Sequence, residues 1–216
     1  MLCLGRDTRW GRVGETFGED PFLVGKLGAA IVEGYEKDGL VAACLKHYIG
    51  YGEATGGRDA YDTEVSERKL REVFLPPFAE ALKTGASTVM TAYGSISGVP
   101  MTAHRKLLRG VLKEELGFEG FVVTDWYNVG ALRTKQKVAE SYDAAVRLAI
   151  SAGNDMSMMS HDFYDSAIRQ AKEGKIPMEE IDDAVLSYNE IKALATGNPM
   201  IIEHANLETE VNKLKM

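Results

Sequence analysis

The sequence of 216 residues contains only two cysteines, Cys3 and Cys44, and they do not have the spacing of a metal-ligand pair. This scarcity argues against a disulfide framework and against a cysteine-based zinc site. No apolar run approaches the ~20 residues that a membrane-spanning helix needs, so we expect no membrane span. Lys and Arg number 25 against 32 Asp and Glu, a net charge of -7. Without a basic stripe, nucleic acid and anionic membranes are disfavoured as partners.

Targeting signals are also missing from the beginning of the chain. Met1 to Leu4 run directly into Gly5-Arg6-Asp7, without a basic segment or a long apolar segment. Read on its own, this beginning predicts a cytoplasmic location. The remaining composition, 45% hydrophobic and 26% charged, is ordinary for a soluble globular protein and excludes disorder as the main state.

Short apolar runs alternate with amphipathic stretches along the sequence. The runs predict strands near residues 2–4, 41–45, 88–92, 121–124 and 155–158. The amphipathic stretches predict helices capped by Asp20, Ser66 and Thr102, and further helices over residues 138–149, 162–172 and 178–195. The first helix carries Leu23, Leu27, Ile31 and Tyr35 on one face, and Pro76-Pro77 should interrupt the second.

Strand–helix alternation of this kind indicates parallel strands joined by helical crossovers. No GxGxxG motif follows a strand, so the fingerprint of a dinucleotide-binding fold is missing. Polar residues instead follow the apolar runs, as in a (β/α)-barrel, whose chemistry lies at the carboxyl ends of its strands. Five predicted strands, against eight in a complete barrel, indicate a partial barrel over residues 1–197. Residues 198–216 are predicted to form a polar tail with a short helix.

Asp125 is the strongest candidate for a catalytic residue, because it follows the buried run of residues 121–124. A carboxylate there would be partly desolvated, and Trp126 beside it offers a flat apolar surface. This pair suits a sugar, because a ring can stack on the indole while the carboxylate attacks or stabilises an oxocarbenium-like carbon. The alternative is that Asp125 caps the following helix and Trp126 belongs to the core.

Lys46 and His47 end the preceding predicted strand and could donate hydrogen bonds to ligand hydroxyls. A salt-bridged lysine and a core histidine are equally compatible with the local sequence. A third interpretation is that Lys46 is a Schiff-base nucleophile, which would require a lowered pKa.

Arg12 and Arg58 lie in glycine-containing loops, where a rigid guanidinium could fix hydroxyls or a carboxylate. Loop salt bridges with Glu15 and with Asp59 are the simpler interpretation. Tyr93 follows another predicted strand and could reach the same end of the sheet, or it could belong to the edge of the core. The remaining histidines lack metal-ligand spacing, so we predict no metal site.

Together these segments resemble glycoside hydrolase family 3. Residues 6–21, RDTRWGRVGETFGEDP, are similar to its RDPRWGRxxETFGEDP segment. Five shorter segments resemble later motifs of the family, in the same order. They are Lys46-His47-Tyr48, Gly57-Arg58-Asp59, Val65-Ser66-Glu67-Arg68, Met90-Thr91-Ala92-Tyr93 and Val122-Val123-Thr124-Asp125-Trp126. The loop after Lys46-His47 is similar to the β-glucosidase and β-xylosidase branch rather than to the N-acetylglucosaminidase branch.

The resemblance implies a retaining, exo-acting hydrolase of β-linked glucosides or xylosides, with Asp125 as the nucleophile. Arg12, Lys46, His47, Arg58 and Tyr93 would hold the glycone, and Trp126 would pack against the sugar. The family often has a cis peptide between its Lys and His. No metal or organic cofactor is implied.

Two departures from the family shape the prediction. The family barrel begins about two strands earlier, so the fold is expected to be a TIM-type (β/α)8 barrel that lacks its first strands. The family's acid/base glutamate comes from a second domain, and none of Glu15, Glu19 and Glu53 is marked as its replacement. A non-catalytic sugar-binding or assembly fragment is therefore the alternative function. Open strand edges near residues 2–4 and 155–158 lead us to expect a homo-oligomer or a complementing domain.

Overall fold

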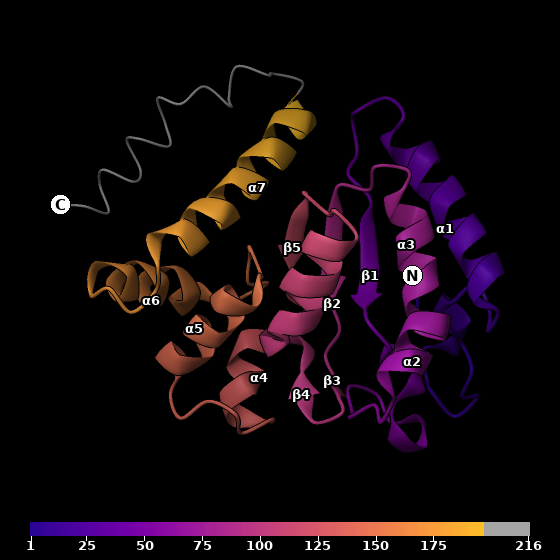
Figure 1. Cartoon of the computed structure of the whole chain (residues 1–216), viewed down its shortest axis with the longest axis horizontal. Coiled ribbons are helices and arrows are strands. Elements are labelled where there is room, and N and C mark those ends of the chain that lie inside the picture. Colours follow the sequence, from indigo (N-terminus) through magenta and orange to yellow (C-terminus); the bar gives the residue numbers. More distant parts are fainter. Residues whose placement is uncertain (197–216) are drawn as a thin grey trace.

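A three-stranded parallel sheet lies at the centre of the computed structural model, which describes residues 1–196 (Figure 1). Its strands are β1 (Cys44–Tyr48), β2 (Thr88–Thr91) and β5 (Phe121–Val123), in the order β1-β2-β5. The segment of residues 2–4 adjoins β1, where the Leu2 N–H donates to the Lys46 carbonyl at 2.7 Å. On the other side, Met156 forms an isolated parallel bridge with Val123.

Helices connect and flank these strands, with α1 to α3 on one side of the view in Figure 1 and α4 to α6 on the other. Between residues 1 and 196 these elements are, in chain order, α1 (Pro21–Glu36), α2 (Glu67–Lys69), a π turn (Leu70–Phe74), α3 (Leu75–Leu82), a hairpin of β3 (Ser95–Ile96) and β4 (Val99–Pro100), a π-helical segment (Lys106–Glu115), α4 (Asn128–Thr134), α5 (Tyr142–Ala152), α6 (His161–Lys172) and α7 (Met178–Thr196).

The order of the strands distinguishes a barrel from an open doubly wound sheet. Neighbouring segments follow one another in the chain, from residues 2–4 through β1, β2 and β5 to Met156. A doubly wound sheet reverses its strand order at a switch point, and no reversal occurs in this part of the chain. The predicted partial (β/α)-barrel is therefore confirmed as the fold class.

Two predicted helix starts are confirmed by their capping bonds. The Asp20 carboxylate accepts the Leu23 N–H at 2.7 Å, and the Ser66 hydroxyl accepts the Lys69 N–H at 3.2 Å. The predicted interruption at Pro76-Pro77 is wrong. The helix passes through a π turn, Leu70–Phe74, before both prolines enter α3. This wider turn leaves room for two residues that have no N–H to donate.

Several predicted boundaries also need correction. Thr102 lies in a 3-10 turn (Met101–Ala103) and caps no helix, and α5 begins after Ser141, which accepts the Ala144 N–H at 3.1 Å. The helix α4 was not predicted. The strand predicted over residues 41–45 is β1, which begins and ends three residues later (Cys44–Tyr48). Residues 2–4 and 155–158 adjoin the sheet without forming strands. The short helix expected within residues 198–216 lies outside the described residues.

The sheet separates two hydrophobic clusters. Val89 and Val122 pack with the surrounding helices in the main cluster, which also contains Tyr48, Phe78 and Leu108. The intervening residues Met90, Phe121 and Val123 form a second cluster with Met158. Since successive strand residues point to opposite faces, the second cluster marks the inner face of the barrel arc.

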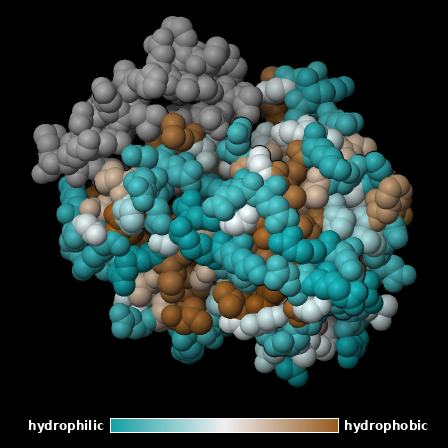
Figure 2. All heavy atoms as spheres, in the orientation of Figure 1, coloured by the Kyte–Doolittle hydropathy of each residue, from teal (hydrophilic) through white to brown (hydrophobic). Residues whose placement is uncertain are grey.

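The apolar face expected on α1 is not its core face. Val24, Gly25, Gly28 and Val32 are buried instead, and a hypothetical Cβ on Gly28 would lie 2.4 Å from Leu2 Cδ2, so a larger residue there would displace the buried Leu2 side chain. The outer stripe is largely exposed and consists of Phe22, Leu23, Leu27, Ile31 and Tyr35. Apolar patches also lie among hydrophilic side chains on the face drawn in Figure 2. The expected homo-oligomer or complementing domain remains a prediction.

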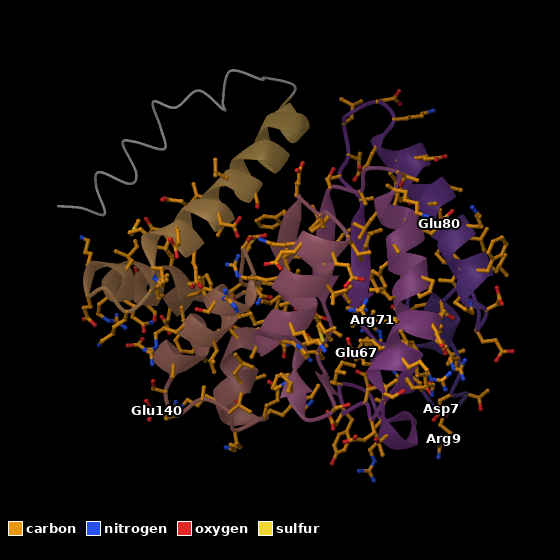
Figure 3. All side chains as sticks on the ribbon, viewed as in Figure 1. Asp7, Arg9, Glu67, Arg71, Glu80 and Glu140 are labelled. Atoms are coloured by element: carbon orange, nitrogen blue, oxygen red, sulfur yellow. The ribbon has the colours of Figure 1, made fainter. Side chains whose placement is uncertain are left out.

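Ion pairs cover much of the outer surface. Arg71 contacts Glu67 one helical turn away at 3.2 Å, and both side chains lie close together in Figure 3. Asp7 and Arg9 form a second pair at 2.7 Å, which holds the pKa of Asp7 at about 2. Exposed pairs of this kind contribute little to stability, so they do not account for the fold.

A buried ion pair joins the helix before β5 to the segment after α5. Lys113 Nζ lies 2.8 Å from Asp155 Oδ1, and the Asp155 side chain is only 1% exposed. Asp155 Oδ2 accepts the Val122 N–H at 2.7 Å, which fastens this segment to β5. Burial raises the pKa of Asp155 to about 6, although the charge of Lys113 opposes this shift.

Replacing Lys113 with methionine should destabilise the protein by about 3 kcal/mol near neutral pH, because it leaves a buried carboxylate without its cation. A raised folded-state pKa means that the stabilising contribution of Asp155 is present at low pH and is lost as pH rises through about 6. Lys113→Met raises that pKa further. Urea unfolding should therefore show a larger loss near pH ~7.5 than near pH ~5. The double variant Lys113→Met/Asp155→Asn should recover most of the loss, whereas equal losses at both pH values would contradict this explanation.

Candidate functional site

Asp125 lies at the carboxyl end of β5. Its side chain is on the same face as Phe121 and Val123, the inner face of the barrel arc, and the residue is 7% exposed. Asp125 Oδ1 accepts the Trp126 N–H at 2.7 Å. The other oxygen, Oδ2, lies 3.3 Å from His47 Nε2 but accepts no directed hydrogen bond from any residue that the structure describes.

The pKa of Asp125 reflects opposing effects. Burial raises it, and this is the largest effect. The Trp126 N–H, the phenol of Tyr93 and the charges of Arg12 and Lys46 lower it. The carboxylate is thus desolvated but surrounded by donors and cations. Burial thus favours the neutral acid, the donors and cations favour the carboxylate, and one carboxylate oxygen accepts no hydrogen bond from the described residues.

The alternative interpretation of Asp125 and Trp126 is wrong on both counts. The helix α4 begins at Asn128 after Tyr127, and no side chain caps it. Trp126 is 51% exposed and therefore does not belong to the core. Its indole contacts Tyr127 edge-on, with the ring centroids 5.9 Å apart. An exposed indole beside a buried carboxylate is the arrangement expected for stacking on a sugar ring.

His47 is buried and faces Asp125 from the end of β1. The predicted cis peptide between Lys46 and His47 is present, and a second one between Tyr48 and Ile49 was not predicted. Burial, with the charges of Arg12 and Lys46, lowers the pKa of His47 to about 3, so the ring is neutral at neutral pH. The His47 backbone N–H donates to Cys3 Sγ at 3.2 Å.

Lys46 aligns with Met90 in the register of β1 and β2, which places it on the inner face. Its ammonium forms no ion pair or hydrogen bond with the described part of the chain. The interpretation as a salt-bridged lysine is therefore wrong. A cation without a partner beside a carboxylate is available to bind a ligand hydroxyl.

Arg12 combines the two roles considered for it. It pairs with Glu15 through two hydrogen bonds of 2.7 and 2.8 Å, as the simpler interpretation predicted. Its NH1 group also donates to the Tyr51 hydroxyl at 3.4 Å. Through its charge, Arg12 lowers the pKa of both Asp125 and His47 and is thus electrostatically part of this site.

Tyr93 joins the cluster, whereas Arg58 lies apart from it. Burial and the neighbouring Asp125 charge raise the pKa of Tyr93 to about 12, so the phenol keeps its proton and interacts with the carboxylate. Arg58 is exposed, with its guanidinium 5.3 Å from the centre of the Tyr61 ring. The Arg58–Asp59 salt bridge considered as an alternative is not formed, and Asp59 instead accepts the Trp10 indole N–H at 3.0 Å.

Tyr51 was not predicted as a site residue, although it lies between several candidate residues. It is 2% exposed, and its ring packs edge-on against His47 and Trp10, with centroids 4.9 and 5.2 Å apart. The ring centroid of Tyr93 is 6.3 Å away. A tyrosine within a glycine-rich loop has no periodicity, so only the three-dimensional contacts reveal its place.

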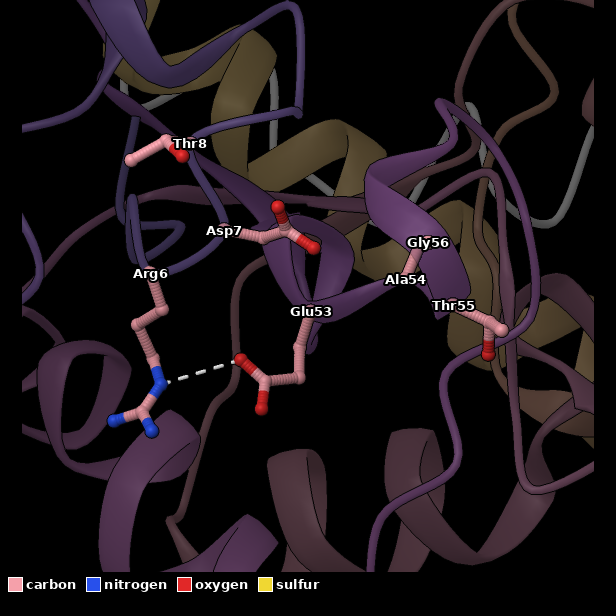
Figure 4. A pocket seen from close by; sticks show the side chains of 7 residues that line it. All are labelled: Arg6, Asp7, Thr8, Glu53, Ala54, Thr55 and Gly56. Atoms are coloured by element: carbon pink, nitrogen blue, oxygen red, sulfur yellow. Dashed lines mark hydrogen bonds and ion pairs between the residues drawn. The ribbon is translucent and has the colours of Figure 1, made fainter.

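A polar pocket of ≈ 380 Å³ adjoins the same loops (Figure 4). It is lined by Arg6, Asp7, Thr8 and residues 53–56, and none of the predicted site residues lines it. Glu53 extends toward Arg6, with an Oε2–Nε distance of 3.2 Å, and also pairs with Lys69. These pairings engage Glu53, as the Arg12 pair engages Glu15.

Two further properties concern the whole of the described chain. Within residues 1–196, no group of three or more His, Cys, Asp or Glu side chains is arranged to hold a metal ion. Among the helices that the structure describes, none combines the length and apolar character needed to cross a membrane.

The strand order and this cluster define the class of protein: a β/α-barrel domain with a polar site at the carboxyl ends of its strands. Residues 1–188 match the glycosyl hydrolase family 3 N-terminal domain. The chain belongs to this family.

Relatives of known activity share the family. A beta-xylosidase of Formosa agariphila is 42% identical over 161 residues, which cover 71% of this chain and 22% of that protein. A lysosomal beta glucosidase of Dictyostelium discoideum is 39% identical over 198 residues, covering 86% of this chain and 24% of that protein.

Solved structures agree in fold. The crystal structure of a beta-glucosidase from Listeria innocua superimposes with a TM-score of 0.87 and 34% identity, covering 97% of this chain and 30% of that one. A beta-glucosidase from intestinal bacteria, described as involved in saponin metabolism, gives a TM-score of 0.84 and 43% identity over 94% of this chain and 27% of that one. The chain thus spans between a fifth and a third of the length of these relatives.

Proposed function

We propose that this chain carries the glycone site and the nucleophile of a retaining, exo-acting glycoside hydrolase for β-linked glucosides or xylosides. One observation carries the proposal most directly. Asp125 Oδ2 is a buried carboxylate oxygen without a directed hydrogen bond, next to neutral His47 and in the field of Lys46. Names of relatives, β-glucosidases and β-xylosidases, support the substrate class.

In the proposed reaction, Asp125 Oδ2 attacks the anomeric carbon and forms a covalent glycosyl ester. The bond from that carbon to the leaving oxygen breaks, and its electron pair departs with the aglycone. His47, Lys46 and Arg12 would bind glycone hydroxyls, with Trp126 against the ring. Hydrolysis of the ester by water then completes retention of configuration.

The leaving oxygen ordinarily needs a proton from a second carboxyl group about 5–5.5 Å from the first. Glu15 and Glu53 are engaged in ion pairs, and Glu19 is exposed. We therefore propose that another domain or partner supplies the acid/base.

This division of roles suggests a direct experiment with 2,4-dinitrophenyl β-glucoside, whose leaving group departs without protonation. The chain alone should release one equivalent of dinitrophenolate in a burst and then turn over slowly, because no base activates water for the second step. Absence of a burst in the presence of measurable glucose binding would instead support the non-catalytic sugar-binding or assembly fragment. That second candidate is favoured by the lack of a free second carboxyl group among the site residues described.

The pH dependence of the burst should respond to Tyr93. The Tyr93→Phe variant loses the phenol whose interaction with Asp125 lowers the pKa of this carboxyl group, so this pKa should rise. Because the nucleophile must be ionised, the acid limb of the burst rate should move to higher pH. Tyr61→Phe, on the exposed side of the loop, should leave the limb unchanged. A limb that stays in place or moves to lower pH in Tyr93→Phe would contradict the assignment.

A further inference from the structure

Tyr51 packs against several residues of the candidate site. Its buried ring touches His47 edge-on at 4.9 Å and lies beneath the Arg12 guanidinium, 5.4 Å from the ring centre. The Tyr51 hydroxyl accepts the Arg12 NH1 group at 3.4 Å. A single side chain therefore contacts two of the groups that surround Asp125.

Tyr51 is in turn fixed from its outer side. The Asp59 carboxylate accepts the Trp10 indole N–H at 3.0 Å, and, in addition to burial, its interaction with the Tyr51 hydroxyl raises the pKa of Tyr51. Trp10 is almost fully buried and packs edge-on against the Tyr51 ring at 5.2 Å. Asp59 thus holds the polar ends of two packed aromatic rings, and this carboxylate has no direct contact with Asp125 or His47 among the interactions of the described residues.

We propose that Tyr51, held by Asp59, is a positioning residue that sets the places of Arg12 and His47 around the Asp125 carboxylate. This inference rests on the proposed function. Neither residue needs to touch the substrate. The hydroxyl of Tyr51 fixes the direction of the Arg12 fork, and its ring limits the movement of His47, so loss of the anchor would misplace both groups relative to the glycone.

A matched pair of variants separates positioning from stability. Tyr51→Phe removes the hydroxyl between Asp59 and Arg12 and retains the ring. Tyr48→Phe removes another buried phenol, which donates to the Leu107 carbonyl at 3.0 Å on the helix side of β1. Tyr51→Phe should slow the dinitrophenolate burst about tenfold, mainly in its limiting rate, while Tyr48→Phe should lower thermal stability and leave the rate unchanged. Asp59→Asn, which keeps an acceptor oxygen, should recover part of the rate lost in Asp59→Ala.

A readout independent of catalysis follows the His47 ring by ¹⁵N-detected NMR in the full chain. Asp59→Ala should shift the ring nitrogens of His47, because the effect passes through Tyr51, and Tyr48→Phe should not. Unshifted His47 signals in Asp59→Ala, or equal burst losses in Tyr51→Phe and Tyr48→Phe, would overturn the proposal. If the wild-type chain shows no burst but His47 shifts as expected, the proposed catalytic function fails while the positioning role stands.

Discussion

Replacing Asp125 with glycine is expected to abolish the dinitrophenolate burst, with a loss of at least about 10³-fold in rate. Asp125 follows β5 at the rim of the inner face, and its Oδ2 atom is the one carboxylate oxygen of the cluster free to attack. No second carboxylate of the cluster can take over as the nucleophile, because His47 and Tyr93 both interact with the Asp125 carboxylate itself. The burst measured by stopped-flow absorbance checks this outcome.

The space left by Asp125→Gly provides a stringent control. Azide should enter it, attack the anomeric carbon from the side that Asp125 occupied and give an α-glycosyl azide as dinitrophenolate departs. Asp125→Asn keeps the volume of the side chain and should not respond to azide. Equal bursts in wild type and Asp125→Gly, or a β-glycosyl azide as product, would contradict the assignment.

The second large effect is expected at Lys46. Its ammonium has no ion-pair partner within the described chain, so Lys46→Met should leave the free energy of unfolding nearly unchanged. A charged hydrogen bond to a ligand hydroxyl contributes about 1.5–3 kcal/mol, so affinity for a glucose-like inhibitor such as gluconolactone should fall about 10- to 150-fold. Calorimetric titration measures both the affinity and its loss.

A lysine on the outer surface serves as the control for Lys46. Lys26 lies on α1 and pairs with Glu80 on α3, so Lys26→Met should bind the inhibitor like wild type. Unchanged affinity in Lys46→Met would remove Lys46 from the glycone site. Borohydride trapping of a carbonyl substrate on Lys46 would instead revive its interpretation as a Schiff-base nucleophile.

Local chemistry explains which features the sequence could predict. Asp20 and Ser66 are capping residues next to apolar periodic stretches, and both cap their helices as expected. Asp125, Lys46 and His47 directly follow apolar runs, and parallel strands bring such ends together at one edge of the sheet. Position along the chain was therefore sufficient to place these three residues in one region.

Features that depend on packing could not be predicted in this way. The outer stripe of α1 has stronger periodicity than its core face, yet Gly25 and Gly28 are buried because they permit close approach to α3 and to Leu2. Arg12 could be placed in a loop, but its contact with Tyr51 depends on how two loops fold over β1. Arg58 was predicted in the glycone site, and the structure places its guanidinium on Tyr61, so its role stays a prediction.

The most direct measurement is peptide mass mapping after incubation of the chain with a 2-deoxy-2-fluoro-β-glucosyl fluoride. The fluorine at carbon 2 slows hydrolysis of the glycosyl ester, so the covalent intermediate accumulates. We expect one sugar per chain, esterified to Asp125. A sugar attached to Glu15, Glu53 or any residue other than Asp125 would contradict it.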